Sequence, residues 1–442
     1  MGDWLKMTAA ELGRGIAAGA IDPVDLTEAY LNAIDAHELT PRIYARSTAD
    51  RARAEARAAR DRAVSGLRRS PLDGVPVSWK DLFDSAGTVT EAGSKLLAGR
   101  VPDRDARVLA NASAAGLVCL GKTHMTELAF SGLGLNPMTK TPPCVNDAEA
   151  APGGSSSGAA TSVAFGLAAA GIGSDTGGSV RIPSVWNDLV GLKTTSGRLS
   201  LKGVVPLCPR FDTVGPLCRS VEDAGLLVAA MEGTKPADLA GAPLSGLRLL
   251  ALEGAPLVDA EGPVLQAFEA AVGRLSAAGA IVSSGALPDV DDVLKTSGLV
   301  FASEAYGLWK DEIEANPDAM FYQVRERFRG GADVSAPDYV AAWRTIERHR
   351  AGYLAATAGY DAVILPTAPI MPPNVERLNT ENDYFVHSNL MALRNTRIGN
   401  LLGLCALTLP LSVPSTGLML LGAPMAEARL LRIGAAIEAE LA

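Results

Sequence analysis

The sequence predicts one large α/β domain. Short apolar runs typical of buried strands, at residues 247–252, 361–366 and 406–410, alternate with longer segments of helical periodicity. Neither an internal repeat nor a low-complexity tract interrupts the 442 residues, and no segment marks a clear domain boundary. The chain is 48% hydrophobic, and a chain of this length can bury an extensive core. We therefore expect a single domain over residues 1–442.

Charge and composition restrict which partners and which cellular compartment we expect for the protein. The formal net charge of −9 argues against nucleic acid as a partner, because a phosphate backbone attracts basic surfaces. The amino-terminal segment is too polar for a signal peptide or a membrane span, so we expect a soluble, cytoplasmic protein without a membrane partner. The five cysteines include no CxxC pair and the four histidines show no metal-ligand spacing, which predicts free thiols and no metal site.

Helix signals dominate the beginning of the chain. Thr8 and Glu11 have the capping-box spacing, and we expect a helix from there to Gly19. Asp22 followed by Pro23 starts a second helix, because proline is favoured at the first helical position. The alternating arginines and acids of residues 47–64 predict an exposed helix.

A strand at residues 75–80 carries the first candidate residue. Val75, Val77 and Trp79 form its apolar side, so Lys80 points to the other side, near the carboxyl end of the strand. In open α/β sheets, ligands bind at that end of the strands. Lys80 is therefore a candidate for the functional site.

Strands and helices follow one another through the rest of the chain. A helix begins at the cap residue Ser220, and helical patterns dominate residues 300–358. The other expected elements are helices at 103–116, 263–278 and 424–442 and strands at 117–120, 247–252, 280–282, 361–366 and 406–410.

Residues 151–200 are the most informative part of the chain. Two glycine turns that end in serine, residues 153–155 and 177–179, flank an apolar run at 158–170, which we expect to be a buried helix. Glycine pairs let a ligand approach the backbone, and their N–H groups can surround negative charge. Hydroxyl groups beside such donors favour acyl-transfer chemistry.

These motifs resemble the amidase signature family. The family has a GGSS(G/S)G turn, an Ala-rich helix and a G-(T/S)-D-x-G-G-S-(I/V)-R-x-P turn, and the corresponding residues here are 153–158, 158–170 and 173–183. The sequence VGLKT at 190–194 and the strand that carries Lys80 complete the pattern.

The resemblance is strong over residues 72–228. It implies a mixed central β-sheet covered by helices on both faces, with a more variable pocket rim at 236–360. It also implies hydrolysis of a small carboxylic amide to acid and ammonia or amine, without a cofactor. A homodimer is compatible with the sequence.

The resemblance assigns roles to individual residues. Ser179 is the expected nucleophile, and Lys80 is the expected base, acting through Ser155, which a cis peptide bond holds. Lysine can serve as a base where burial lowers its pKa, and successive backbone N–H groups before Ser179 can face the carbonyl oxygen of a bound amide. The expected oxyanion donors are Thr176, Gly177 and Gly178, and the expected supporting residues are Asp175, Arg181 and Ser156, the last as a partner of Lys80.

Residues 122–130 are similar to the family's GKTNMxEFA segment, with His124 where asparagine is usual. In the family that segment commonly lines the acyl side of the site. Met125 and Phe130 are therefore candidate pocket residues, although both residue types suit an ordinary core equally well.

Three other motifs suggest different chemistry, and each lacks its structural context. Residues 116–123 fit the Walker A pattern, but the four intervening residues are apolar and predict a strand rather than a phosphate loop. Residues 154–158 fit the G-x-S-x-G nucleophile elbow, which must follow a strand, and no apolar run precedes them. Residues 175–177 match one aspartic-protease turn, and a single-chain enzyme of that class needs two.

Two alternatives within the family stay open. The glutamine-hydrolysing subunit of the tRNA-dependent amidotransferase shares the fold and the catalytic triad, which corresponds here to Ser179, Ser155 and Lys80. It has an aspartate upstream of an N-L-A-G sequence, where this chain has Leu393 upstream of Asn400, with Arg394 and Arg397 nearby. Hydrolases of carbamates, ureas or aryl anilides share the triad as well. The hypothesis of a catalytically inactive binding protein on the same scaffold is disfavoured, because all three residues of the triad are present.

Overall fold

One mixed β-sheet runs through the molecule. The computed structural model describes residues 4–442, and eleven strands within them form this sheet. The strands are β1 (Tyr44–Ser47), β2 (Pro76–Lys80), β3 (Val118–Thr123), β4 (Ala170–Asp175), β5 (Val190–Lys193), β6 (Thr213–Cys218), β7 (Arg248–Leu252), β8 (Ile281–Gly285), β9 (Ala362–Pro366), β10 (Cys405–Pro410) and β11 (Gly417–Gly422).

The sheet order is β1-β3-β2-β4-β6-β5-β10-β11-β9-β7-β8. Strand β2 is parallel to both of its neighbours, β3 and β4, and β7 is parallel to β9 and β8. The strands from β4 through β6, β5, β10 and β11 to β9 pair antiparallel, as does β1 with β3. The predicted mixed sheet is confirmed.

Helices cover the sheet. They are α1 (Ala9–Ala17), α2 (Pro23–Ala36), α3 (Thr40–Ile43), α4 (Ala49–Val64), α5 (Arg107–Ala114), α6 (Ser157–Ala164), α7 (Arg181–Trp186), α8 (Val221–Glu232), α9 (Gly262–Ala277), α10 (Pro288–Leu294), α11 (Ser297–Ala315), α12 (Tyr322–Arg329), α13 (Ala336–Thr357), α14 (Val375–Thr380), α15 (Asn382–Leu401) and α16 (Glu427–Leu441). No helix within residues 4–442 is long and apolar enough to cross a membrane.

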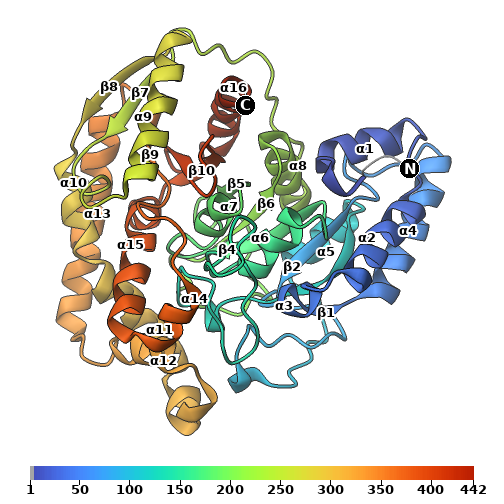
Figure 1. Ribbon diagram of the computed structural model, residues 1–442, viewed down its shortest axis with the longest axis horizontal. Coiled ribbons are helices and arrows are strands. Elements are labelled where there is room, and N and C mark those ends of the chain that lie inside the picture. Colours follow the sequence, from blue (N-terminus) through green and yellow to red (C-terminus); the bar gives the residue numbers. More distant parts are fainter. Residues whose placement is uncertain (1–3) are drawn as a thin grey trace.

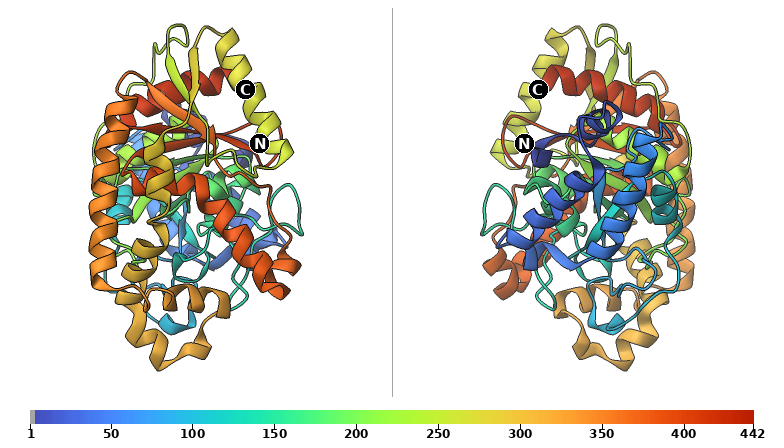
Figure 2. Two further views of the ribbon diagram at one scale, coloured as in Figure 1. Left: turned by 90° about the vertical axis from the view of Figure 1, so that its left-hand side faces the viewer. Right: turned by 90° about the vertical axis from the view of Figure 1, so that its right-hand side faces the viewer.

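The two ends of the sheet carry different groups of helices. Helices α1, α2 and α4 lie beside the end with β1, and α9, α10 and α13 lie beside the end with β7 and β8 (Figure 1). Both views of Figure 2 place α12 at the opposite end of the molecule from α16. Helix α6 packs against β2 and β4, near the middle of one half of the sheet.

Several predicted helix starts are confirmed. Thr8 and Glu11 form a complete capping box at α1. The Asp22 carboxylate accepts hydrogen bonds at the start of α2, whose first residue is Pro23. The Ser220 hydroxyl accepts from the backbone N–H of the third residue of α8. Local capping chemistry was therefore sufficient to locate these helices.

The helix predicted at 158–170 is wrong in its second half. Helix α6 ends at Ala164, and Gly166 follows in the left-handed region with φ of 72°, a conformation that commonly ends helices. The chain then turns into β4, which begins at Ala170. Strands β1, β4, β5, β6 and β11 were not predicted. In β4, for example, the alanine and glycines have low strand propensity.

The glycines of β4 let α6 lie close to the sheet. A Cβ atom on Gly171 would lie 2.5 Å from the carbonyl oxygen of Ala159, and one on Gly173 would lie 2.5 Å from Oγ of Ser156. Both distances are too short for a real Cβ contact, so any other residue would push the helix away. The start of α6 is thereby held against the carboxyl end of β4.

Candidate active site

Lys80 ends strand β2 inside the molecule. Its side chain is fully buried, and its Nζ donates hydrogen bonds to Oγ of Ser155 at 2.7 Å and to Oγ of Ser174 at 2.8 Å. Burial lowers the pKa of Lys80 from 10.5 to about 7, against the opposing attraction of Asp175 and Asp212. A lysine with this pKa is partly neutral at neutral pH and can accept a proton.

Ser155 and Ser179 lie on two turns that the backbone holds together. Both serines are buried, and the peptide bond between Gly154 and Ser155 is cis, as the resemblance implied. The backbone N–H of Ser156 donates to the carbonyl oxygen of Ser179 at 3.2 Å. Within residues 4–442 no hydrogen bond joins the Ser155 and Ser179 hydroxyl groups, and catalytic hydrogen bonds are often long before substrate binds.

Asp175 organises the turn that carries Ser179. Its carboxylate accepts hydrogen bonds from the backbone N–H groups of Gly178 at 2.9 Å and Val180 at 3.1 Å. Burial acts to raise the pKa of Asp175, but Arg181, Lys193 and Asn400 together outweigh burial and hold this pKa well below its usual range. An ionised carboxylate therefore fixes the backbone on both sides of the serine.

Arg181 ties the same turn to helix α15. Its Nη2 and Nε atoms reach the two oxygens of Asp175 at 2.9 and 3.0 Å, and its Nη1 donates to the carbonyl oxygen of Thr396 at 2.7 Å. Asn400 completes the network, since its Oδ1 accepts from Arg181 and its Nδ2 donates to Asp175. Asp175 and Arg181 thus contact the turn as predicted, whereas the role of Asn400 was not predicted.

Gly178 limits which N–H groups can face a substrate. Its φ is 140°, and a Cβ atom there would lie 2.2 Å from Oγ1 of Thr396, so only glycine fits. The prediction that its N–H group faces a substrate is wrong for this structure, because that group points to the Asp175 carboxylate, a stronger acceptor than a neutral carbonyl. The backbones of Thr176 and Gly177 are left as the candidate oxyanion donors.

A second buried carboxylate, that of Asp212, holds the other side of the turn. It accepts the Thr176 hydroxyl at 2.5 Å and the backbone N–H groups of Leu207 and Cys208 at 3.0 and 3.1 Å. Burial raises the pKa of Asp212, although the hydrogen bonds from these donors act to lower it. The sequence analysis did not identify Asp212, although it lies within residues 72–228, where the family resemblance is strong.

Ser156 was predicted to be a partner of Lys80, and this is wrong. The Ser156 hydroxyl donates to the carbonyl oxygen of Ser174 at 3.2 Å, and the Ser174 hydroxyl occupies the place beside Lys80. The reason is the close packing of α6 on β4, which directs Ser156 toward the strand backbone. Ser174 was missed because β4 itself was not predicted.

A cavity adjoins Ser179, and only one of the two pocket candidates lines it. Phe130 lines this cavity. Met125 does not, because its side chain is fully buried in the hydrophobic core while its carbonyl oxygen accepts from the amide of Asn136. The lining consists of Ala129, Phe130, Ser131, Thr176, Gly177, Ser179, Leu207, Phe301, Arg327, Leu393 and Arg397.

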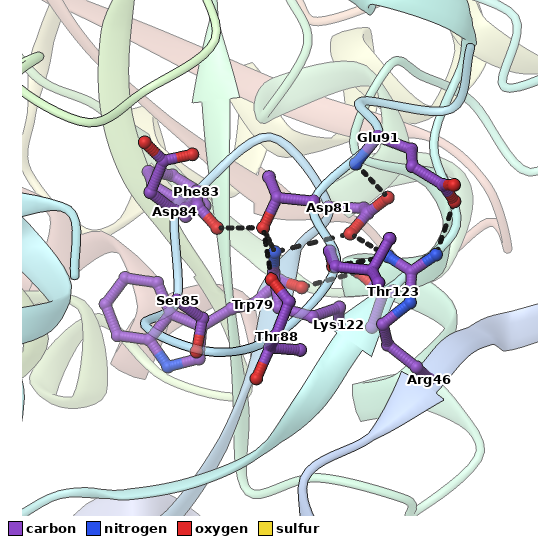
Figure 3. Close-up of polar contacts among 12 residues, drawn as sticks. Arg46, Trp79, Asp81, Phe83, Asp84, Ser85, Thr88, Glu91, Lys122 and Thr123 are labelled. Atoms are coloured by element: carbon purple, nitrogen blue, oxygen red, sulfur yellow. Dashed lines mark hydrogen bonds and ion pairs between the residues drawn. The ribbon is translucent and has the colours of Figure 1, made fainter. Parts of the chain in front are cut away.

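The Walker-like segment forms no phosphate loop. Its residues 118–123 are strand β3, and Lys122 is buried there. The Lys122 Nζ lies 3.3 Å from Oδ1 of Asp81 and donates to Oγ1 of Thr90 at 2.9 Å. Arg46 pairs with the same Asp81 carboxylate (Figure 3). The lysine is therefore part of a structural cluster of charges.

The loop before Ser155 and the state of the cysteines agree with the sequence analysis. The residues just before Ser155 form a loop rather than a strand, so the context of a nucleophile elbow is missing. The five cysteines are free and buried. Among residues 4–442, no group of three or more His, Cys, Asp or Glu side chains is arranged to hold a metal ion.

Comparison with known proteins places the chain in a family. The family model described as Amidase matches residues 25–431. The chain is 36% identical to 2-amino-5-chloromuconic acid deaminase of Comamonas testosteroni, over 91% of this chain and 89% of that protein. It is 32% identical to a glutamyl-tRNA(Gln) amidotransferase subunit of Chloroflexus aurantiacus, over 98% of this chain and 96% of that protein.

A solved structure shows the same architecture. The crystal structure of an amidase superposes with a TM-score of 0.87 at 31% identity, covering 99% of this chain and 100% of that chain. The match in sequence therefore extends to the whole fold. This chain belongs to the amidase signature family and is a hydrolase of amide carbon–nitrogen bonds.

Proposed function

We propose that the chain hydrolyses a small carboxylic amide through an acyl-enzyme on Ser179, with Ser155 and Lys80 as the proton relay. The observation that carries this proposal is the 2.7 Å hydrogen bond from Lys80 Nζ to Ser155 Oγ. The lysine that makes it has a pKa that burial lowers to about 7. When neutral, its amine can accept a proton that Ser155 has passed on from Ser179.

Attack on the amide begins with the proton transfer. The Ser179 proton passes to Ser155 Oγ while the Ser155 proton passes to Lys80 Nζ, and Ser179 Oγ bonds to the carbonyl carbon. The negative charge that forms on the carbonyl oxygen faces the backbone N–H groups of Thr176 and Gly177. Each such donor stabilises the transition state by about 3 kcal/mol.

Collapse of the tetrahedral intermediate reverses the relay. The carbon–nitrogen bond breaks as the proton returns from Lys80 through Ser155 to the departing nitrogen, which leaves as ammonia or amine. Water then attacks the ester on Ser179, losing its proton along the same route, and release of the acid restores the free serine. Protons balance over the cycle, and no cofactor takes part in these steps.

Glutamine hydrolysis for a tRNA-dependent partner is a second candidate, because a subunit of that amidotransferase is among the relatives. In that enzyme the resemblance places an aspartate where this chain has Leu393, and Leu393 lines the cavity. A leucine offers no charge to the amino group of glutamine, so the cavity favours another amide. Carbamates, ureas and aryl anilides can pass through the same relay and belong in the same substrate screen.

We also propose that the enzyme works in the cytoplasm. Its cysteines are free and buried, which suits a reducing compartment. Cell fractionation followed by an activity assay tests this placement.

Ammonia or amine release from a panel of amides tests the proposed function. The native chain should turn over at least one amide, and Ser179→Ala should abolish turnover with an unchanged circular dichroism spectrum. A fluorophosphonate should label Ser179 alone, as identified by peptide mass. The matched control Ser196→Ala changes an exposed serine and should keep both activity and labelling. Labelling at Ser156 would contradict the assignment of the nucleophile.

A further inference from the structure

Two arginine side chains line the cavity beside Ser179 without an acidic partner. Arg327 comes from α12 and Arg397 from α15. Within residues 4–442 neither guanidinium forms an ion pair, and no carboxylate is among the charges that act on either one. Arg327 is held by a hydrogen bond from its Nε to the carbonyl oxygen of Phe130 at 2.9 Å.

Arg397 lies against the turn that carries Ser179, and each guanidinium lies near an aromatic ring of the cavity lining. A Cβ atom on Gly177, in the candidate oxyanion turn, would lie 3.6 Å from Cγ and 4.0 Å from Nε of Arg397. The guanidinium carbon of Arg327 lies 4.7 Å from the ring centre of Phe130, and that of Arg397 lies 5.9 Å from the ring centre of Phe301. Stacking of this kind steadies the plane of a guanidinium.

The two positive charges are costly where they lie. Burial, together with repulsion from Arg397, lowers the pKa of Arg327 to about 9, and burial lowers the pKa of Arg397 to about 10. Both groups are still protonated at neutral pH. Elsewhere in this site the buried Arg181 is paired with Asp175, so the chain supplies a carboxylate where an arginine serves the fold. Arg327 and Arg397 have no such carboxylate partner within residues 4–442, and an anionic ligand would provide one.

We propose that Arg327 and Arg397 bind a carboxylate on the acyl part of the substrate, and that the preferred substrates are monoamides of short dicarboxylic acids. This rests on the proposed function. A guanidinium presents parallel N–H donors that match the two oxygens of a carboxylate. The apolar lining residues Ala129, Leu207 and Leu393 suit the carbon chain that joins the carboxylate to the amide carbonyl.

A comparison of matched substrates tests this specificity. Malonamate, succinamate, glutaramate and adipamate are each compared with the neutral straight-chain amide of the same carbon number. At least one of the four should have a kcat/KM on the order of 100-fold above that of its neutral counterpart, since hydrogen bonds to a buried charge are strong. If no anionic amide exceeds its neutral counterpart, the proposal is wrong.

Substitution of each arginine assigns the preference to these residues. Arg327→Met and Arg397→Met should each reduce the preference about tenfold or more, mainly by lowering kcat/KM for the anionic amide. The controls Arg329→Met on α12 and Arg394→Met on α15 remove the same charge outside the cavity and should keep the preference. A preference that survives in both cavity variants would overturn the proposal.

A binding measurement separates this inference from the proposed function. Calorimetry on the Ser179→Ala chain should detect the dicarboxylic acid product of the best substrate, and adding Arg397→Met should weaken that binding about tenfold or more. Turnover of neutral amides that Ser179→Ala abolishes, without binding of any dicarboxylate, would refute the carboxylate site and leave the catalytic proposal intact. Binding of the dicarboxylate without turnover of any amide would refute the catalytic proposal and leave the carboxylate site intact.

Discussion

The amine of Lys80 donates a hydrogen bond to the hydroxyl of Ser155 across 2.7 Å, although 75 positions separate the two residues in the sequence. The contact exists because β2, which ends in Lys80, lies beside β4 in the sheet, and α6, which follows Ser155, packs on both strands. The base and its relay are thus held by regular structure rather than by a long loop. Such support keeps a catalytic geometry within a fraction of an ångström.

Gly173→Ala tests whether this packing sets the geometry of the relay. The added Cβ atom would lie 2.5 Å from Oγ and 2.8 Å from Cβ of Ser156, so the start of α6 must move and carry Ser155 with it. We expect kcat/KM to fall on the order of 100-fold, as for other small misplacements of reacting groups. Gly298→Ala, in open space on α11, is the control and should retain full activity. Native activity in Gly173→Ala would show that the relay tolerates displacement.

Arg181→Met should destabilise the fold. It removes the partner of a fully buried carboxylate, Asp175, and such a loss typically costs about 3–5 kcal/mol in the free energy of unfolding. The exposed pair of Arg377 and Glu381 provides the control, since Arg377→Met should cost less than about 1 kcal/mol. Urea unfolding of the three proteins measures both values. Equal losses in the two variants would mean that the buried pair adds no special stability.

The motifs of the site were visible in the sequence, but their partners were not. Lys80, Ser155 and Ser179 stand in local patterns with a recognisable spacing, and the mixed sheet followed from the family resemblance. Ser174 was missed because β4 is rich in alanine and glycine and carries no strand signal. The contact assigned to Ser156 was wrong for the same reason, since the direction of that side chain depends on how α6 meets β4.

The cavity was harder to predict than the turns. Arg327 and Phe301 come from the helical region 300–358, in which the sequence shows periodicity but no sign of what each helix faces. Met125 illustrates the same limit, because a methionine beside a functional segment looks identical whether it lines a pocket or fills the core. Local chemistry is encoded in short motifs, whereas the wall of a pocket depends on packing between distant elements.

Amide hydrolysis should need neither metal nor nucleotide. We expect kcat to be unchanged after exhaustive treatment with a chelator and dialysis, since the proposed relay moves protons only between side chains. ATP should produce no shift in Tm, because the amine of Lys122 is already paired with Asp81. Activity that is lost on chelation and restored by a divalent cation would contradict the relay, as would ATP binding that Lys122→Met abolishes.

The proposed relay depends on the protonation of Lys80. The amine accepts a proton only when it is neutral, so activity should increase as the pH rises through the pKa of about 7. An ordinary surface lysine would be less than about 0.1% neutral at pH 7. His124 is a poor substitute as base, because burial lowers its pKa to about 4 and it would show no titration near neutrality.

The pH dependence of kcat/KM in the native chain and in Lys80→Ala is therefore the most direct measurement. If Lys80 is the base, kcat/KM of the native chain should rise through one deprotonation near pH 7 to a plateau. Lys80→Ala should lose activity by on the order of 10²–10⁴ together with that rise. Lys80→Arg should not restore it, because a guanidinium keeps its proton in this range. A Lys80→Ala enzyme that retained both the native rate and the native pH profile would show that Lys80 is not the base.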